Sequence, residues 1–342
     1  MIPTLIEKYK RLRTEQYLAQ TYQYAYAFVG IGQHSLSNLY PVLHYLQVPL
    51  KYICVTSEEK ARMVERKFHG VTATASLKRI VDDETIKGVF VSASPSAHES
   101  IASQILKSGK SLFIEKPPCQ SLEELDKLIA LQKQFAAPIA MVGLQKRYAP
   151  VIQLLKKRLS KEHLINYDLH YLTGNYPEGN ALLDLYIHPI DLVIYLFGKP
   201  EIIACKEVRK DSYILMLQHP HIMGTLELSS SYSWNNAEET MKVCTQSGVY
   251  YLTQMETLTF SPKPTDIFSV PMEKVMNWHG KKEVLLQRNN FNAILTNNQI
   301  YTNGYFNEIV AFTDGVEGKK TKNLTSLNSV RDTYEIIEKL SF

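Results

Sequence analysis

The fold of this chain is decided by residues 24–35, which read YAYAFVGIGQHS. The first six of these residues form a short apolar run, typical of a strand that is buried on both faces of a parallel sheet. A G-x-G-x-x-S turn follows the run, and a helical pattern begins at about residue 37. A strand, a glycine turn and a helix in this order predict a dinucleotide-binding fold.

The glycine turn is the first candidate site. Glycines at positions 30 and 32 would permit a tight turn and let the backbone approach a pyrophosphate. Serine replaces the third glycine of the G-x-G-x-x-G fingerprint and is small enough for the helix to pack on the strand. A plain structural turn is the alternative interpretation. We expect a dinucleotide to contact Gly30, Gly32, Gln33, His34 and Ser35.

Strands and helices alternate from this turn to residue 142. This alternation predicts a Rossmann-type, doubly wound parallel sheet. The pattern predicts strands at 51–56, 88–92, 111–114 and 139–142, and helices at 37–46, 58–68, 97–108 and 122–135.

The pattern changes after residue 150. Strand-like runs with short turns dominate from 202 to 260, after a helix at 151–159, a strand at 165–171 and a mostly helical stretch at 181–197. We therefore predict a C-terminal α+β domain with a large, open-faced, mainly antiparallel sheet. The expected organisation is a helical extension (1–23), a dinucleotide-binding domain (24–149) and a substrate-binding and oligomerisation domain (150–342), whose closing helices at 305–317 and 327–340 can pack back on the first domain.

Composition narrows the function classes. The chain has 342 residues, and its apolar fraction of 45% excludes a disordered chain. Its net charge of +4 is lower than the concentrated positive charge that nucleic-acid-binding proteins usually carry. No segment reaches about 18 consecutive apolar residues, so we expect no membrane partner. Cys54 and Cys205 lie in apolar runs and are expected to be buried free thiols, which suits a cytoplasmic location. Residues 4–20 predict a basic amphipathic helix that packs on the first domain, or that serves a membrane or a partner.

The end of the second strand bears on the choice of cofactor. An acidic residue there would hold the ribose 2′-hydroxyl of NAD, and the strand tip carries none. Thr56 and Ser57 could instead contact a 2′-phosphate, with Lys60 or Arg62 nearby, which favours NADP slightly over NAD. Equally, Thr56 and Glu59 could form a capping box for the next helix.

Five further segments carry a family resemblance. They are 94–98 (SPSAH), 115–118 (EKPP), 146–148 (KRY), 183–192 (LDLYIHPIDL) and 305–312 (YFNEIVAF). Together these segments resemble the Gfo/Idh/MocA oxidoreductase family, with its P…H turn, EKP motif, arginine turn, DxxxHxxD helix and closing helix. The resemblance extends from about residue 24 to residue 340 and leaves the N-terminal extension outside.

The resemblance implies a function as well as a fold. It implies NAD(P)-dependent oxidation or reduction of a sugar-like hydroxyl or carbonyl, and homodimers or homotetramers formed through the C-terminal sheet. It also implies that Ser94, Pro95, His98, Glu115 and Lys116 contact the cofactor, and that Lys116 reaches the substrate hydroxyl. A surface lysine in a strand-end loop is the alternative for Lys116.

The expected chemistry needs a group that takes the hydroxyl proton while hydride leaves the carbon. Lys116 can do so if a desolvated site lowers its pKa. His188 is a second candidate because imidazole titrates near neutrality. Asp184 would share a face with His188 on a continuous helix, although Pro189 can make the helix kink or begin there. A core histidine is the alternative for His188.

Arg147 completes the predicted substrate site with Asp184 and His188. Its guanidinium suits a cofactor or substrate anion, and an ion pair at the domain boundary is the alternative. Asp191 is either functional or structural. The two histidines of residues 219–221 are too few for a metal site, so we expect no metal.

The predicted function is hydride transfer between nicotinamide and a sugar, a sugar derivative or a nucleotide-linked sugar, with Lys116 and His188 handling the proton. Substrate choice is expected to rest on the sheet face and on the loops 172–180 and 277–303. Two alternatives stay open. One is an NAD-dependent glycoside hydrolase with no net cofactor turnover, and the other is a non-catalytic protein that senses a dinucleotide or a sugar.

Overall fold

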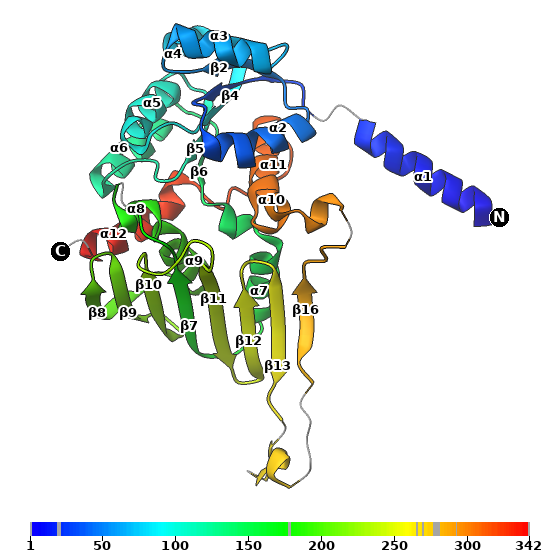
Figure 1. Ribbon diagram of the computed structural model, residues 1–342, viewed down its shortest axis with the longest axis vertical. Coiled ribbons are helices and arrows are strands. Elements are labelled where there is room, and N and C mark those ends of the chain that lie inside the picture. Colours follow the sequence, from blue (N-terminus) through cyan, green and yellow to red (C-terminus); the bar gives the residue numbers. More distant parts are fainter. Residues whose placement is uncertain are drawn as a thin grey trace.

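The computed structural model describes residues 2–18, 22–176, 179–264, 266–268, 270–275, 281–291 and 293–340. Two sheets with their helices form the molecule, one above the other in Figure 1. The end of the predicted first helix and parts of the two predicted substrate loops lie outside the described residues.

The first sheet has six strands in the order β3-β2-β1-β4-β5-β6, and all its pairings are parallel. The doubly wound parallel sheet predicted from the sequence is therefore confirmed. Strand order reverses between β1 and β4, and ligands of such sheets bind beyond the carboxyl ends of the strands at that point. The strands are β1 (Ala25–Val29), β2 (Leu50–Cys54), β3 (Thr72–Thr74), β4 (Ile86–Val91), β5 (Ser111–Glu115) and β6 (Ala140–Gly143).

Helices connect these strands and cover both faces of the sheet. A π-helical segment (Ser35–Leu39) leads directly into α2, so the predicted helix 37–46 begins earlier and changes its winding. The sequence pattern missed β3 and α4, which are too short to show a period. The helices are α2 (Tyr40–Tyr45), α3 (Glu58–Lys67), α4 (Leu77–Asp82), α5 (Pro95–Lys107) and α6 (Leu122–Gln134).

One helix from the end of the chain packs on this first sheet. Phe312 of α11 (Tyr305–Val316) lies 4.9 Å from Phe90 and 5.8 Å from Phe113, measured between ring centroids. Phe28 and Tyr40 extend the same aromatic core. Helix α11 is thereby part of the half of the molecule that is built on the first sheet, while the residues at which one domain ends and the next begins stay a prediction.

The second sheet has eight strands in the order β16-β13-β12-β11-β7-β10-β9-β8. Only the pairing of β7 with β10 is parallel, so the prediction of a mainly antiparallel sheet is confirmed. The strand β16 lies inside the segment 277–303 that the sequence predicted as a loop, which corrects that prediction. The strands are β7 (Leu164–Leu172), β8 (Glu201–Arg209), β9 (Ser212–Gln218), β10 (Met223–Ser229), β11 (Glu238–Thr245), β12 (Gly248–Thr253), β13 (Thr257–Pro262) and β16 (Glu283–Gln287).

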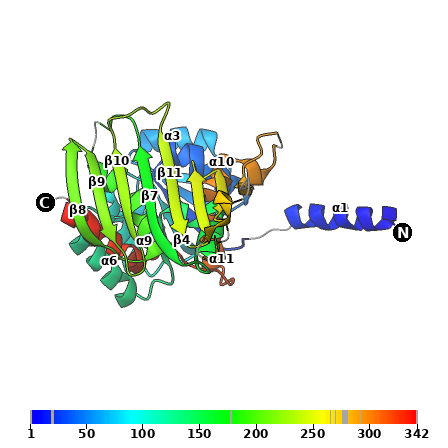
Figure 2. The ribbon, with the colours of Figure 1, turned by 90° about the horizontal axis from the view of Figure 1, so that it is seen from below.

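Helices cover only one face of the second sheet, as Figure 2 shows. Side chains on β9 alternate between buried and exposed, so Ile214 and Met216 stand on the open face. Cys205 is exposed on β8, which corrects the expectation that it is buried, whereas Cys54 is buried. The helices of this half are α7 (Pro150–Leu159), α8 (Ala181–Asp184), α9 (Ile187–Phe197), α10 (Gln299–Thr302) and α12 (Arg331–Leu340).

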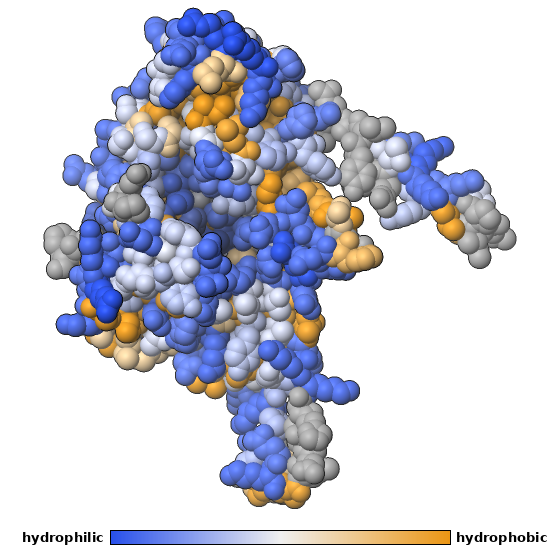
Figure 3. Space-filling view, in the orientation of Figure 1, coloured by the Kyte–Doolittle hydropathy of each residue, from blue (hydrophilic) through white to orange (hydrophobic). Residues whose placement is uncertain are grey.

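Two segments project from the body. Helix α1 (Ile2–Leu18) points away from the first sheet in both views, so the expectation that it packs on that domain is wrong. Leu5 and Tyr9 on this helix are exposed. The small hairpin β14 (Asp266–Ile267) and β15 (Val270–Pro271) forms an apolar tip at the far end of the second sheet in Figure 3. No described helix is long and apolar enough to span a membrane.

Candidate active site

The glycine turn stands at the carboxyl end of β1, beside a cavity of about 510 Å³. Gly30 adopts a φ of 101°, and a Cβ there would lie 2.1 Å from the carbonyl oxygen of Ser92, so only glycine fits. At Gly32 a Cβ would meet no atom within 4 Å, which leaves space for a ligand to approach the backbone. These features fit a dinucleotide. The predicted contacts Gly30, Gly32, Gln33, His34, Ser35, Thr56 and Ser94 all line this cavity.

Ser35 closes the turn. Its Oγ accepts the Gly32 N–H at 3.0 Å and donates to the Gly32 carbonyl at 3.1 Å. The side chain is fully buried, as the packing of the helix against the strand requires. The serine in the third fingerprint position therefore shapes the turn from inside.

The tip of β2 presents a hydroxyl and an amine. Thr56 lines the cavity, and its Oγ1 accepts from Lys60 Nζ at 3.1 Å. Ser57 does not line the cavity, because its side chain caps α3 by accepting the Lys60 N–H at 3.2 Å. Ser57 is therefore the N-cap of α3, which corrects the capping box predicted at Thr56, while the cofactor contact of Ser57 stays a prediction.

Lys116 follows β5 and forms a cis peptide bond with Pro117. Its Nζ donates to the backbone oxygen of Asp184 at 2.6 Å. Asp184 belongs to the second half of the molecule, so this bond joins the carboxyl edge of the first sheet to the predicted substrate domain.

His98 and Pro95 do not reach the cavity. His98 Nε2 accepts the Ala93 N–H, so Nδ1 carries the proton that is donated to the Pro117 carbonyl at 2.7 Å. The ring is buried, with both nitrogens occupied. Pro95 is exposed at the first turn of α5. His98 thus holds the segment that follows Lys116, and Pro95 begins a helix, while their contacts with the cofactor stay predictions.

Glu115 also differs from its predicted role. Its carboxylate is buried, with Oε2 accepting the Lys116 N–H at 3.2 Å and Oε1 lying 3.1 Å from His34 Nε2. It therefore contacts the glycine turn and the lysine segment and does not line the cofactor cavity.

Asp184 and His188 belong to two separate helices. Helix α8 ends at Asp184 and α9 begins at Ile187, so the break foreseen near Pro189 is present and the continuous helix is not. Asp184 Oδ2 accepts the Asn180 N–H at 2.9 Å. His188 is buried, and its Nδ1 has no hydrogen-bond partner.

The electrostatics of this region favour neutral bases. Burial lowers the pKa of Lys116 against the opposing charges of Glu115 and Asp184, and Lys146 lowers it further. Burial also lowers the pKa of His188 well below its ordinary value, helped by the charges of Lys116 and Lys146. Burial thus favours the neutral form of the His188 imidazole.

Arg147 lies outside the cavity. Its Nε and Nη2 donate to the two carboxylate oxygens of Asp191, at 2.7 and 2.5 Å. Its Nη1 donates to the Leu324 carbonyl and the Ser329 hydroxyl. The side chain is buried with its donors engaged, so the predicted substrate contact is corrected to a structural ion pair, and Asp191 is structural with it.

A family match covers this region. The model of an oxidoreductase family with an NAD-binding Rossmann fold, Gfo/Idh/MocA, matches residues 24–144, which include the glycine turn and the Glu-Lys-Pro segment. The match covers the part of the chain that folds into the first sheet. The fold that the family implies is the one described for the first sheet.

Known proteins extend the comparison. The oxidoreductase YceM of Salmonella typhimurium is 27% identical over 173 residues, 49% of this chain and 56% of the relative. The inositol 2-dehydrogenase/D-chiro-inositol 3-dehydrogenase of Lactiplantibacillus plantarum is 25% identical over 185 residues, 51% of this chain and 53% of the relative. The chain thus spans about half the length of these curated relatives. A dehydrogenase structure from Chromobacterium violaceum shares the fold, with a TM-score of 0.77 and 20% identity over 94% of this chain and 95% of its own.

Sequence reasoning did not single out two residues near this site, Glu308 and Lys146. Glu308 on α11 is fully buried, and neither carboxylate oxygen makes a hydrogen bond of normal geometry, although the backbone of Leu144 acts to lower its pKa. Burial raises the pKa of Glu308 well above its ordinary value, and Glu115 adds to the rise. Lys146 pairs with Glu239 and lies 4.6 Å from the ring centre of Tyr171. The sequence does contain a signal for Glu308, because it is a single carboxylate among the apolar residues of the predicted helix 305–317.

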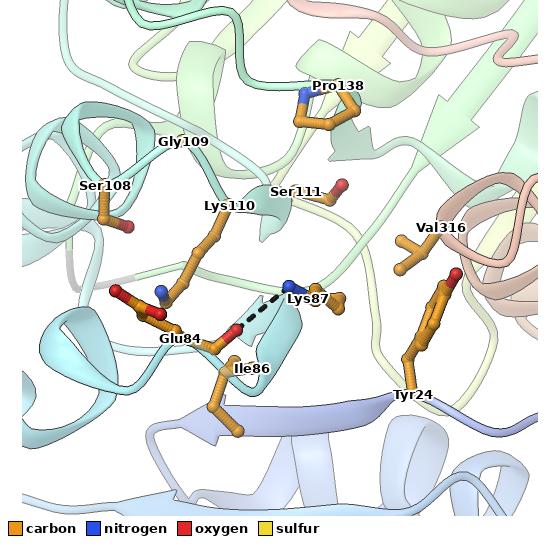
Figure 4. A pocket seen from close by; sticks show the side chains of 10 residues that line it. All are labelled: Tyr24, Glu84, Ile86, Lys87, Ser108, Gly109, Lys110, Ser111, Pro138 and Val316. Atoms are coloured by element: carbon orange, nitrogen blue, oxygen red, sulfur yellow. Dashed lines mark hydrogen bonds between the residues drawn. The ribbon is translucent and has the colours of Figure 1, made fainter.

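A second cavity, of about 410 Å³, lies at the opposite edge of the first sheet. Figure 4 shows Lys87 and Lys110 there, beside Glu84, at the amino ends of β4 and β5. Ligands of parallel sheets bind beyond the carboxyl ends, so this cavity is not the dinucleotide site. In the described ranges, no group of three or more His, Cys, Asp or Glu residues could hold a metal ion.

Proposed function

We propose that this chain is an NAD(P)-dependent oxidoreductase that moves a hydride between nicotinamide and a carbon of a sugar, a sugar derivative or a nucleotide-linked sugar. The observation that carries the proposal is the bond from Lys116 Nζ to the Asp184 backbone oxygen. It brings the lysine of the dinucleotide domain to the segment that carries His188. A substrate hydroxyl bound between Lys116 and His188 would lie next to a group that can accept its proton.

The residues divide the work as follows. When bound, the nicotinamide supplies a hydride acceptor or donor. On oxidation the hydroxyl proton passes to Lys116 Nζ, whose lowered pKa favours the uncharged amine. The neutral imidazole of His188 accepts a hydrogen bond from a neighbouring substrate hydroxyl at Nδ1, the atom without a partner. The Asp184 carboxylate, held by Asn180, contacts another hydroxyl.

The substrate class rests on the same geometry and on one relative. A curated relative is named as an inositol dehydrogenase, whose substrate is a cyclic polyol. Arg147 and Lys146 are both paired with carboxylates, which leaves neither as the obvious partner of a substrate anion. Both observations support a neutral ring with several hydroxyls.

The pair of Thr56 and Lys60 supports NADP as the preferred cofactor. An ammonium next to a hydroxyl at the tip of β2 suits a 2′-phosphate, and no carboxylate is found where the 2′-hydroxyl of NAD would be held.

Turnover tests the proposal. Protein with NAD or NADP is supplied with myo-inositol, D-glucose or UDP-N-acetylglucosamine, and reduced cofactor is followed by absorbance. We expect reduction with at least one of the three and none with a Lys116→Met variant. Release of nitrophenol from a nitrophenyl glucoside without net cofactor reduction would instead establish the glycoside hydrolase. Dinucleotide binding with neither reaction would favour the sensor.

We further propose that a second copy of the chain covers the open face of the second sheet. Exposed Ile203, Ile214 and Met216 support this, since exposed apolar clusters mark interaction surfaces. Light scattering should give a dimer or tetramer, and Met216→Lys should shift it towards the monomer.

A further inference from the structure

One contact on the cofactor cavity is not part of the proposed reaction. His34 lines the cavity on the glycine turn, and Glu115 ends the strand on the other side of it. Their facing atoms, Nε2 and Oε1, lie 3.1 Å apart. The N–H direction falls short of hydrogen-bond geometry, so the contact is chiefly one of charge.

The proton on His34 can be assigned from its other neighbour. Nδ1 lies 3.2 Å from the amide nitrogen of Asn38, and an amide nitrogen only donates. Nδ1 is therefore the acceptor, and the proton of the neutral ring is on Nε2, which faces Glu115. The imidazole thus joins the segment after the turn, through Asn38, to the carboxylate.

Glu115 has little freedom to move. A Cβ at Gly143 would lie 2.8 Å from Oε2, so the carboxylate already fills the space beside that glycine. Oε2 accepts the N–H of Lys116, the residue expected to handle the proton. The remaining oxygen, Oε1, is buried without a hydrogen-bond partner, so the charge contact with His34 Nε2 at 3.1 Å is the interaction that offsets its burial.

We propose that His34 is a positioning residue that ties the dinucleotide-binding turn to Glu115 and thereby fixes the backbone segment that carries Lys116. This inference rests on the proposed function. It makes His34 more than a cavity-lining contact, because the imidazole acts on the reaction through Glu115.

The surroundings of His34 agree with this assignment. Burial lowers the pKa of the imidazole, but the contact with Glu115 and its charge outweigh burial and the opposing charge of Lys116, so the pKa is raised above its ordinary value. The other group against the ring is Tyr305 of α11, whose ring centre lies 5.7 Å away. Glu115 is thus the one carboxylate among these described neighbours that faces the ring.

Two measurements test the link. The first is a proton NMR titration of the histidine ring resonances without dinucleotide, with His34→Gln used to identify the signal. We expect the His34 midpoint above the ordinary value in the native chain and below it in Glu115→Gln, where burial and Lys116 remain. A midpoint that Glu115→Gln leaves unchanged would overturn the proposal.

The second measurement is steady-state turnover. His34→Ala should lower kcat by about 10- to 100-fold, the size expected when a catalytic group is misplaced. His34→Gln should restore most of it, because the glutamine amide can donate to Glu115. His44→Gln, on the exposed side of α2, is the matched control and should leave kcat unchanged. Equal losses in His34→Ala and His34→Gln would count against the link.

The two measurements separate this inference from the proposed function. The NMR titration needs neither cofactor nor substrate. A raised midpoint that depends on Glu115, found in a chain that binds no dinucleotide, would overturn the proposed function and retain the contact. Normal turnover, with a His34 midpoint that Glu115→Gln leaves unchanged, would support the proposed function and overturn the role of His34.

Discussion

Two buried charged clusters of this molecule differ in how fully their atoms are paired. Around Arg147 every guanidinium nitrogen donates to Asp191, Leu324 or Ser329, and Thr333 adds a bond to the carboxylate. Next to Lys116, by contrast, His188 Nδ1 has no hydrogen-bond partner. Buried polar atoms are nearly always paired, so unpaired ones in a cluster mark a place that accepts another molecule or holds a proton. We expect the first cluster to contribute to stability, and we propose that the second takes part in the reaction.

The largest expected effect concerns Lys116. Lys116→Met should lower kcat by about 10²- to 10⁴-fold, the range of general acid–base catalysis, with little change in thermal stability. Lys87→Met, in the cavity at the opposite edge of the sheet, is the control and should leave kcat unchanged. The kcat of each variant is measured from the absorbance of the reduced cofactor that it forms. A Lys116→Met enzyme that retained native kcat would remove the lysine from the chemistry.

Arg147→Met should act on stability instead. Breaking one partner of a buried ion pair costs about 3–5 kcal/mol in the free energy of unfolding, because the other charge is left buried. Urea denaturation measures this loss. The double variant Arg147→Met with Asp191→Leu should lose less than Arg147→Met alone. A variant of normal stability with a raised KM would instead make Arg147 a substrate contact.

Glu308 should make stability depend on pH. Its folded pKa is raised, so the folded chain keeps the proton at pH values where the unfolded chain has lost it, and stability falls as the pH rises above the ordinary carboxyl value. Glu308→Gln should remove this fall and be more stable than the native chain at pH 8 by about 1–2 kcal/mol, the cost of an unpaired buried group. Denaturation at pH 5 and pH 8 checks it. An equal pH dependence in both chains would contradict the assignment.

The smallest effect is expected at the tip of β2. Lys60→Ala should weaken NADPH binding by about three- to tenfold and leave NADH binding unchanged, since an exposed ion pair contributes little. Arg66→Ala, later on α3, is the control. If Lys60→Ala weakened the binding of NADH and NADPH equally, Lys60 would not contact the 2′-phosphate.

Much of the fold could be predicted from the sequence, because its signals are local. The apolar run before Gly30 and the alternation of strands and helices after it gave the parallel sheet. The short elements β3 and α4 carry too few residues to show a period. The strand β16 has only three consecutive apolar residues, and the polar residues on both sides of it are typical of a loop. Cys205 is exposed because β8 is the edge strand of its sheet and its side chains are exposed on both faces, which the apolar residues of one strand do not reveal.

The candidate site was predicted less completely, for a physical reason. Motifs name residues but not the direction of their side chains, so His98, Glu115 and Arg147 were expected to contact a ligand, whereas each is bonded to neighbouring protein groups. The contact between His34 and Glu115 joins residues 81 positions apart and has no local signal. The break between α8 and α9 was foreseen as one of two alternatives, because Pro189 restricts the helix there.

The most direct test of the central claim is an equilibrium titration of the purified protein with NADH and NADPH, followed by fluorescence. The account predicts that at least one of them binds with a dissociation constant in the micromolar range or below, with NADPH binding the more tightly. If neither binds, and no dinucleotide is released from the protein on denaturation, the glycine turn is a structural turn and the assignment of the cavity is contradicted.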